Sequence, residues 1–173
     1  MEHLTLGGGC FWCVEAVFDN VIGVIKAESG YMGGDETRAN YEAVCSGTTG
    51  HAEVVQITFD PDQVDREELL DIFWVVHDPT TLNQQGADRG TQYRSVIYYA
   101  NDEEKEIVEK SVLKAQAAFS APVVTELSPL DTYFVAEGYH QSYFKNNPGQ
   151  GYCNAVIPPK LEKLKSKFAS LVK

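Results

Sequence analysis

The chain has 173 residues and a formal net charge of −11, with 43% hydrophobic and 23% charged residues. This length and composition are typical of a globular protein, and we expect one domain that spans residues 1–173. The strong negative charge argues against nucleic acid and anionic membranes as partners. The sequence contains no run of about 18 apolar residues, so no membrane span is predicted. No signal peptide is visible, so we expect a cytoplasmic protein.

The hydrophobic pattern predicts strands that alternate with helices. Strands are expected at 3–6, 23–31, 53–59, 95–99, 123–127 and 132–135. Helices are expected after Cys10, after an N-cap at Asp65, from Asn101 to about Phe119 (the longest one), over 137–145, and from Pro158 onward. Residues 38–50 look irregular, 80–92 form a long polar loop, and 147–153 look mobile. The class is therefore α/β or α+β, with one sheet and helices packed against it.

Cys10 follows three glycines at the point where the first strand gives way to the first helix. Glycine permits a tight turn or a close approach to a ligand. Unpaired N–H groups and the helix dipole favour a negative charge at a helix start, where the pKa of a cysteine can fall to roughly 3.5–7.5. We therefore predict that Cys10 is a reactive nucleophile with a lowered pKa. Cys45 has no comparable context, and we expect a small buried side chain there.

Other side chains fit the attack of a thiolate on an electrophilic sulfur that carries an oxygen. An acid and phenol donors would assist loss of the oxygen. An aromatic pocket would hold a methyl or thioether group. A second thiol would convert a sulfenic acid to a disulfide. The candidates are the acid Glu53, the phenols Tyr41 and Tyr93, the aromatics Phe11 and Trp12, and the distant thiol Cys153.

Six motifs carry a family resemblance. They are Gly9-Cys10-Phe11-Trp12, Cys45-Ser46-Gly47-Thr48-Thr49-Gly50-His51-Ala52-Glu53, His77-Asp78-Pro79-Thr80, Gly90-Thr91-Gln92-Tyr93-Arg94-Ser95, Tyr139-His140-Gln141 and Gly151-Tyr152-Cys153. With these motifs the sequence resembles the peptide-methionine (S)-S-oxide reductases, the A-type methionine sulfoxide reductases, from Gly8 to about Pro158. The resemblance implies a two-layer α/β sandwich of ferredoxin-like type, with a mixed sheet and no metal or organic cofactor.

The resemblance also implies how the first helix and the acid work. Cys10 would attack the sulfur of methionine sulfoxide, and Phe11 and Trp12 would cradle the methyl group. Glu53 would donate the proton that assists loss of the oxygen. The implied activity is thiol-dependent reduction of the S epimer of methionine sulfoxide, protein-bound or free, and the implied role is repair of oxidised proteins.

Further implied roles fall on residues later in the chain. Tyr41 and Tyr93 would hydrogen-bond the sulfoxide oxygen. Asp88 matches a carboxylate that binds the backbone amine of the substrate or supports the site. Cys153 matches the resolving cysteine, whose disulfide thioredoxin would reduce. We expect a monomer.

Cys13 departs from the family pattern, because many relatives have glycine there and some resolve through a cysteine at this position. Cys10 and Cys13 are three residues apart and share one helix face, so a bridge between them needs only local adjustment. Cys13 and Cys153 would either compete for the sulfenic acid or pass the disulfide between them, with Cys153 preferred as the first partner. Asn40, where relatives often have threonine, is a second departure.

Two other classes of protein account for some of the cysteines. Cys10-x-x-Cys13 would suit a thioredoxin-like dithiol enzyme, although no proline-containing partner loop is evident and Cys153 would be idle. The same three cysteines with a histidine would suit a zinc-binding module, although only one close cysteine pair exists. We expect the histidines to make structural hydrogen bonds.

Overall fold

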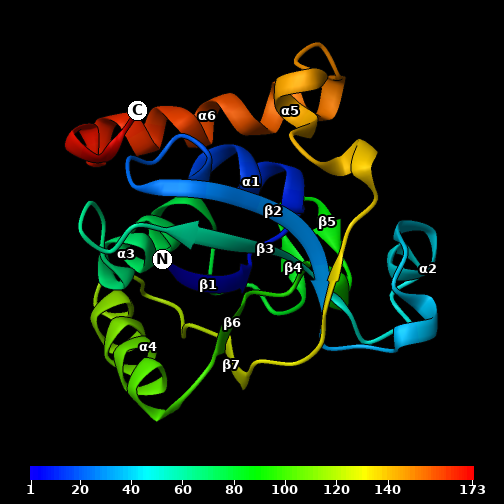
Figure 1. Cartoon of the computed structure of the whole chain (residues 1–173), viewed down its shortest axis with the longest axis horizontal. Coiled ribbons are helices and arrows are strands. Elements are labelled where there is room, and N and C mark those ends of the chain that lie inside the picture. The colour runs from blue at the N-terminus through cyan, green and yellow to red at the C-terminus, as the bar shows by residue number, and fades with distance from the viewer.

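One curled six-stranded sheet forms the centre of the computed structural model, which describes residues 1–173 (Figure 1). The strand order is β7-β6-β1-β3-β2-β8. The bounds are β1 Glu2–Gly7, β2 Val24–Met32, β3 Ala52–Phe59, β6 Val96–Tyr99, β7 Glu126–Pro129 and β8 Tyr133–Val135. Neighbouring strands are antiparallel, except that β6 and β7 are parallel. A separate hairpin pairs β4 Gln84–Gln85 with β5 Asp88–Arg89.

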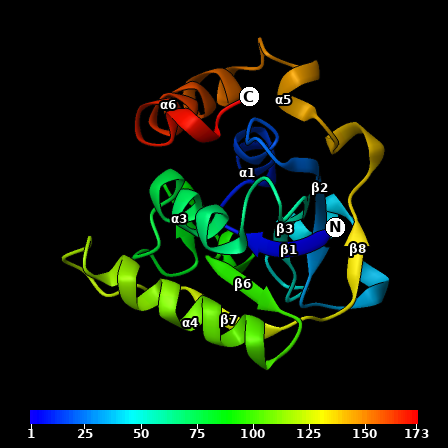
Figure 2. The ribbon, with the colours of Figure 1, turned by 60° about the vertical axis from the view of Figure 1, so that its left-hand side comes forward.

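The four central strands and two helices give the ferredoxin-like arrangement. Helix α1 Phe11–Phe18 connects β1 to β2, α3 Arg66–Val76 connects β3 to β6, and each connection passes one intervening strand. Helix α6 Gly151–Lys167 packs across α1 and α3, while α4 Asp102–Gln116 packs against α3 and β6 (Figure 2). The short helices are α2 Tyr41–Cys45 and α5 Tyr143–Asn146. No helix is both long and apolar enough to cross a membrane. The expected two-layer α/β fold with a mixed sheet is confirmed.

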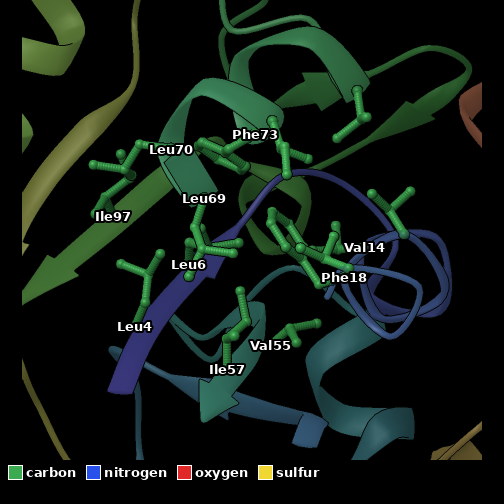
Figure 3. Packing of buried hydrophobic residues seen from close by; sticks show 14 of the residues in the cluster. Leu4, Leu6, Val14, Phe18, Val55, Ile57, Leu69, Leu70, Phe73 and Ile97 are labelled. Carbon is green, nitrogen blue, oxygen red and sulfur yellow. The ribbon is translucent and has the colours of Figure 1, made fainter. Parts of the chain in front are cut away.

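The main hydrophobic core lies between one face of the sheet and helices α1 and α3. Strand alternation turns every second side chain of β1 and β3 toward this face. The buried members shown in Figure 3 include Leu4, Leu6, Phe18, Val55, Ile57, Leu69, Leu70 and Phe73. Each of these is at most 2% exposed, so truncation of any one to alanine should cost about 2–5 kcal/mol. The core fixes α1 against the sheet. It therefore also fixes Cys10, the residue that precedes α1.

The predicted helix caps at Asp65 and Asn101 are confirmed. The Asp65 carboxylate accepts a hydrogen bond from the Glu68 N–H at 2.7 Å, and the Glu68 carboxylate accepts one from the Asp65 N–H at 3.1 Å. The Asn101 side chain accepts from the Glu104 N–H at 2.9 Å. Each cap satisfies N–H groups that a helix start leaves unpaired, which contributes about 1 kcal/mol.

The segment around Cys153 differs from its prediction. The pattern predicts a mobile stretch at 147–153 and a helix from Pro158, but α6 begins at Gly151 and carries Cys153 in its first turn. Gln150 caps this helix, because its side-chain oxygen accepts a hydrogen bond from the Cys153 N–H at 2.8 Å. Glutamine is not a usual N-cap residue, so the pattern misses this start. With 17 residues α6 is the longest helix, ahead of α4 with 15.

Two further segments also differ from their predictions. The irregular stretch 38–50 contains α2, and Asn40 caps it by accepting a hydrogen bond from the Ala43 N–H at 3.0 Å. The helix expected over 137–145 is divided into a 3₁₀ turn, Gly138–His140, and α5. The division falls where Ser142 adopts a positive φ of 53°. Strand β7 begins later than the predicted strand at 123–127.

Candidate active site

Cys10 lies in the turn between β1 and α1, as predicted, and is the N-cap residue of α1. Gly9 has a φ of 93°, and a Cβ atom there would come within 2.7 Å of the Gln85 side chain. A Cβ atom on Gly7 would come within 2.7 Å of the Glu53 carbonyl oxygen. These two glycines therefore allow the turn to pack tightly against β3 and the β4–β5 hairpin. Of the two predicted uses of the glycines, a tight turn and a close approach to a ligand, these contacts correspond to the tight turn.

Glu53, at the start of β3, is the buried acid of the site. Its side chain is 1% exposed, and the Phe11 N–H donates a hydrogen bond to Oε1 at 3.0 Å. The other oxygen, Oε2, is buried and has no hydrogen-bond partner. Burial raises the pKa of Glu53 to about 8, so the carboxyl group is mostly protonated at neutral pH. Protonation gives Oε2 a proton that it can donate to a ligand oxygen.

Cys10 and Cys13 are a coupled pair of buried thiols. A hydrogen bond to Cys13, burial and the charge of Glu53 raise the pKa of Cys10, so the predicted lowering is wrong. Burial disfavours the thiolate there more than the helix start favours it. The hydrogen bond from Cys10 and the positive charge of Lys160 lower the pKa of Cys13, although burial opposes both. Of the two thiols, Cys13 is therefore the one that ionises more easily.

Aromatic rings from α1, α5 and the preceding 3₁₀ turn form one wall of the site. The Trp12 Nε1–H donates a hydrogen bond to His140 Nδ1 at 2.9 Å. The Trp12 ring stacks on Tyr143 with 3.9 Å between centroids and 9° between planes. Phe11 is fully buried in the main core and faces Tyr41 at 6.2 Å. Trp12 is thus held on its edge and on one face, while Phe11 supports the wall from the core.

Tyr41 and Tyr93 are half-buried phenols near Glu53. Burial and then the charges of Cys45 and Glu53 raise the pKa of Tyr41. Burial and the charges of Glu53 and Cys45 likewise raise the pKa of Tyr93. Both phenols therefore stay protonated and can donate hydrogen bonds. The Tyr41 N–H donates to Glu137 Oε2 at 3.0 Å, which ties α2 to the site.

Asp88 lies at a small cavity next to Cys10. The cavity measures about 110 Å³, and its lining includes Cys10, Cys13, Asp88, Tyr152 and Lys160. The Tyr152 hydroxyl donates a hydrogen bond to Asp88 Oδ2, and the same hydroxyl lies 4.0 Å from Cys13 Sγ. Asp88 therefore belongs to a network that supports the cysteine pair.

Cys153 packs against Cys10 and Cys13 in a buried cluster between α1 and α6, in place of the predicted mobile loop. It is fully buried, and burial raises its pKa to about 11. All four cysteines are free thiols. Cys45 is exposed on α2, so the prediction of a buried side chain is wrong. No group of three or more His, Cys, Asp and Glu side chains is placed to hold a metal ion.

For several residues of the site the sequence predicts no catalytic or binding role. Their positions depend on tertiary contacts that no local pattern records. They are Glu137, His140, Tyr143, Tyr152 and Lys160. His140 and Tyr152 belong to the motifs Tyr139-His140-Gln141 and Gly151-Tyr152-Cys153, and this is the only signal in the sequence that points to them.

Three free thiols gathered beside one buried acid are typical of an oxidoreductase that works through cysteine. Comparison with protein families agrees with this class. The model of the family described as peptide methionine sulfoxide reductase matches residues 2–171. The chain belongs to the peptide methionine sulfoxide reductase family, and the predicted family is confirmed. The thioredoxin-like dithiol class is thereby set aside.

Individual relatives cover almost the whole chain. The peptide methionine sulfoxide reductase MsrA of Acinetobacter baumannii (strain AYE) is 57% identical over 173 residues, which are 100% of this chain and 99% of the relative. Mxr1 from Saccharomyces cerevisiae in reduced form has a TM-score of 0.84 at 34% identity, covering 91% of this chain and 89% of that chain. Mxr1 in complex with Trx2 has a TM-score of 0.59 at 22% identity, covering 82% and 84%.

Proposed function

We propose that this enzyme reduces the S epimer of methionine sulfoxide, both in proteins and as the free amino acid, and so repairs oxidised proteins. The observation that carries the proposal is the buried Glu53 carboxyl group. It is protonated at neutral pH, has one unpaired oxygen, and is hydrogen-bonded to the residue that follows Cys10. A sulfoxide oxygen needs such a donor, because it must accept a proton when its bond to sulfur breaks.

The first step transfers oxygen from the substrate to the enzyme. The Cys10 thiolate attacks the sulfoxide sulfur while Glu53 donates its proton to the oxygen, and Tyr41 and Tyr93 hydrogen-bond that oxygen. The attack forms a bond between the Cys10 sulfur and the substrate sulfur. The protonated oxygen then moves to the Cys10 sulfur as this bond and the substrate sulfur–oxygen bond break, and methionine leaves with its sulfur reduced by two electrons. The oxygen remains on Cys10 as a sulfenic acid. Trp12 packs against the methyl group during the attack.

Cys13 is the first thiol to resolve the sulfenic acid in this proposal. Cys13 lines the same cavity as Cys10 and has the lowered pKa, whereas Cys153 does not line that cavity and has a pKa of about 11. The Cys13 thiolate attacks the Cys10 sulfur, the sulfur–oxygen bond breaks, and the leaving hydroxide takes a proton from solvent to become water. Cys153 then attacks Cys13, which moves the disulfide to Cys13–Cys153 and frees Cys10 for another substrate.

A dithiol partner completes the cycle, and we assign this part to thioredoxin. The solved complex of Mxr1 with Trx2 supports the assignment, because Mxr1 shares the fold of this chain. Thioredoxin attacks the enzyme disulfide and becomes oxidised in turn. The net reaction converts one sulfoxide and one thioredoxin dithiol to one methionine, one thioredoxin disulfide and one water.

Turnover of separated epimers tests the proposal. The S and R epimers of a blocked methionine sulfoxide would be incubated with dithiothreitol and either wild-type enzyme or Cys10→Ser, and methionine would be measured by chromatography. Reduction of the S epimer alone, lost in Cys10→Ser, is the expected result. Reduction of the R epimer, or full activity of the variant, would contradict the assignment.

Disulfide mapping tests the order of the thiols. One turnover without reductant, quenched by alkylation and analysed by mass spectrometry, should show Cys10–Cys13 first and Cys13–Cys153 later. In Cys153→Ser the first bridge should accumulate. A first bridge between Cys10 and Cys153 would instead support the order preferred from the sequence.

A further inference from the structure

A groove of about 680 Å³ adjoins the cavity that contains Cys10. Helix α6 forms one wall, and the C-terminal ends of α3 and α4 form the other. Gln85, Val156 and Lys160 line both the groove and the cavity, so the two hollows share a border. Trp74 and Phe119 add apolar surface to the groove. A polypeptide leaving the cavity in this direction would lie in the groove.

Three lysines line the groove along one face of α6, at Lys160, Lys163 and Lys167. The groove is thus basic, although the whole chain carries a net charge of −11. Its one carboxylate, Asp78, already accepts hydrogen bonds from the Thr80 N–H and hydroxyl at 2.9 and 2.5 Å. The local charge is therefore opposite to that of the protein as a whole.

Lysines near helix ends often serve only to neutralise the carbonyl groups there. Lys160 does this, because its Nζ donates a hydrogen bond to the Val76 carbonyl at the end of α3 at 2.6 Å. Lys163 and Lys167 are exposed and form neither a hydrogen bond nor an ion pair. Their charges therefore stay available to a ligand in the groove.

We propose that the groove binds acidic residues that flank methionine sulfoxide in a substrate polypeptide. This inference rests on the proposed function and deepens it by naming a substrate class. Lys160 and Lys167 are about 10 Å apart along α6, a distance that an extended peptide covers in about three residues. Since Lys160 borders the catalytic cavity, carboxylates about two to five residues from the sulfoxide reach Lys163 and Lys167.

Peptide kinetics with matched variants test the inference. Blocked decapeptides with one methionine S-sulfoxide would carry glutamate or lysine two to five residues away, on either side, and kcat/KM would be measured with dithiothreitol. The test variant is the double charge reversal Lys163→Glu and Lys167→Glu. The control is Lys165→Glu, which lies in the same helical turn but does not line the groove. A blocked single methionine sulfoxide reports the basal reaction.

The wild type should prefer the acidic peptide on one side by about tenfold, since each exposed charge pair contributes a factor of a few. The double variant should lose or invert that preference, while Lys165→Glu and the basal reaction stay unchanged. Equal rates for all peptides, or an equal effect of Lys165→Glu, would overturn the inference. A parallel assay with thioredoxin as reductant would overturn it too, if the double variant raised KM for thioredoxin and left the peptide kinetics unchanged. No reduction of the single amino acid would refute the proposed function instead.

Discussion

Replacing Glu53 with glutamine removes one titrating group from the site and keeps its shape. Folding raises the pKa of Glu53 from 4.5 to about 8, so the folded protein holds a proton that the unfolded chain releases between these pH values. The stabilisation from this group is therefore complete below pH 4.5 and is lost as the pH rises through about 8. At about 1.4 kcal/mol per pH unit, the loss is about 3 kcal/mol at pH 7 and about 5 kcal/mol at pH 9.

Glu53→Gln should therefore gain stability relative to wild type as the pH rises. Urea unfolding followed by tryptophan fluorescence, with reductant present, would give the difference in unfolding free energy at pH 5, 7 and 9. Titration of groups that do not interact with Glu53 cancels in this difference, and Glu67→Gln on the exposed surface of α3 serves as the control. A difference that stays constant from pH 5 to 9 would refute the buried-acid reasoning. Turnover by Glu53→Gln should fall about 10²–10⁴-fold, because the proton donor is lost.

Three further substitutions test other parts of the site. Gly9→Ala places a Cβ atom at a φ of 93° and within 2.7 Å of a neighbouring side chain, so urea unfolding should show a loss of about 1–3 kcal/mol. Trp12→Phe keeps a ring but loses the hydrogen bond to His140, so KM for blocked methionine sulfoxide should rise several-fold; an unchanged KM would count against the aromatic wall. Lys160→Gln removes a positive charge that lowers the pKa of Cys13, so the pH midpoint of Cys13 alkylation, read by mass spectrometry, should move upward.

Much of the fold is predictable because its signals are local. Alternation over 53–59 predicts β3, and the Asp65 pair predicts the start of α3, since a strand pattern and a capping box each lie within a few residues. The start of α6 is not predicted, because its N-cap is Gln150 and glutamine is not one of the usual N-cap residues. Local rules therefore predict the elements and fail where a cap is atypical.

The site is predictable only in part, because burial decides its chemistry. Sequence context places Cys10 at a helix start and suggests a lowered pKa, but a hydrogen bond to Cys13 and burial reverse the direction. His140 and Lys160 act through contacts with α1 and α3, which lie more than eighty residues away in the chain. Nothing local to either residue shows which partner it meets.

The charges of the site explain how Cys10, a thiol with a raised pKa, can act as the nucleophile of the proposed mechanism. Attack needs Cys10 ionised and Glu53 protonated, and the charge of Glu53 itself raises the pKa of Cys10. The two groups therefore do not ionise together, and with Cys13 they titrate as one coupled set. A sulfoxide oxygen that accepts a hydrogen bond from Glu53 favours the protonated acid, and so favours negative charge on the thiols. In the proposed mechanism, substrate binding therefore makes Cys10 easier to ionise, because it keeps Glu53 protonated. A permanently low pKa would instead leave Cys10 open to oxidation between turnovers.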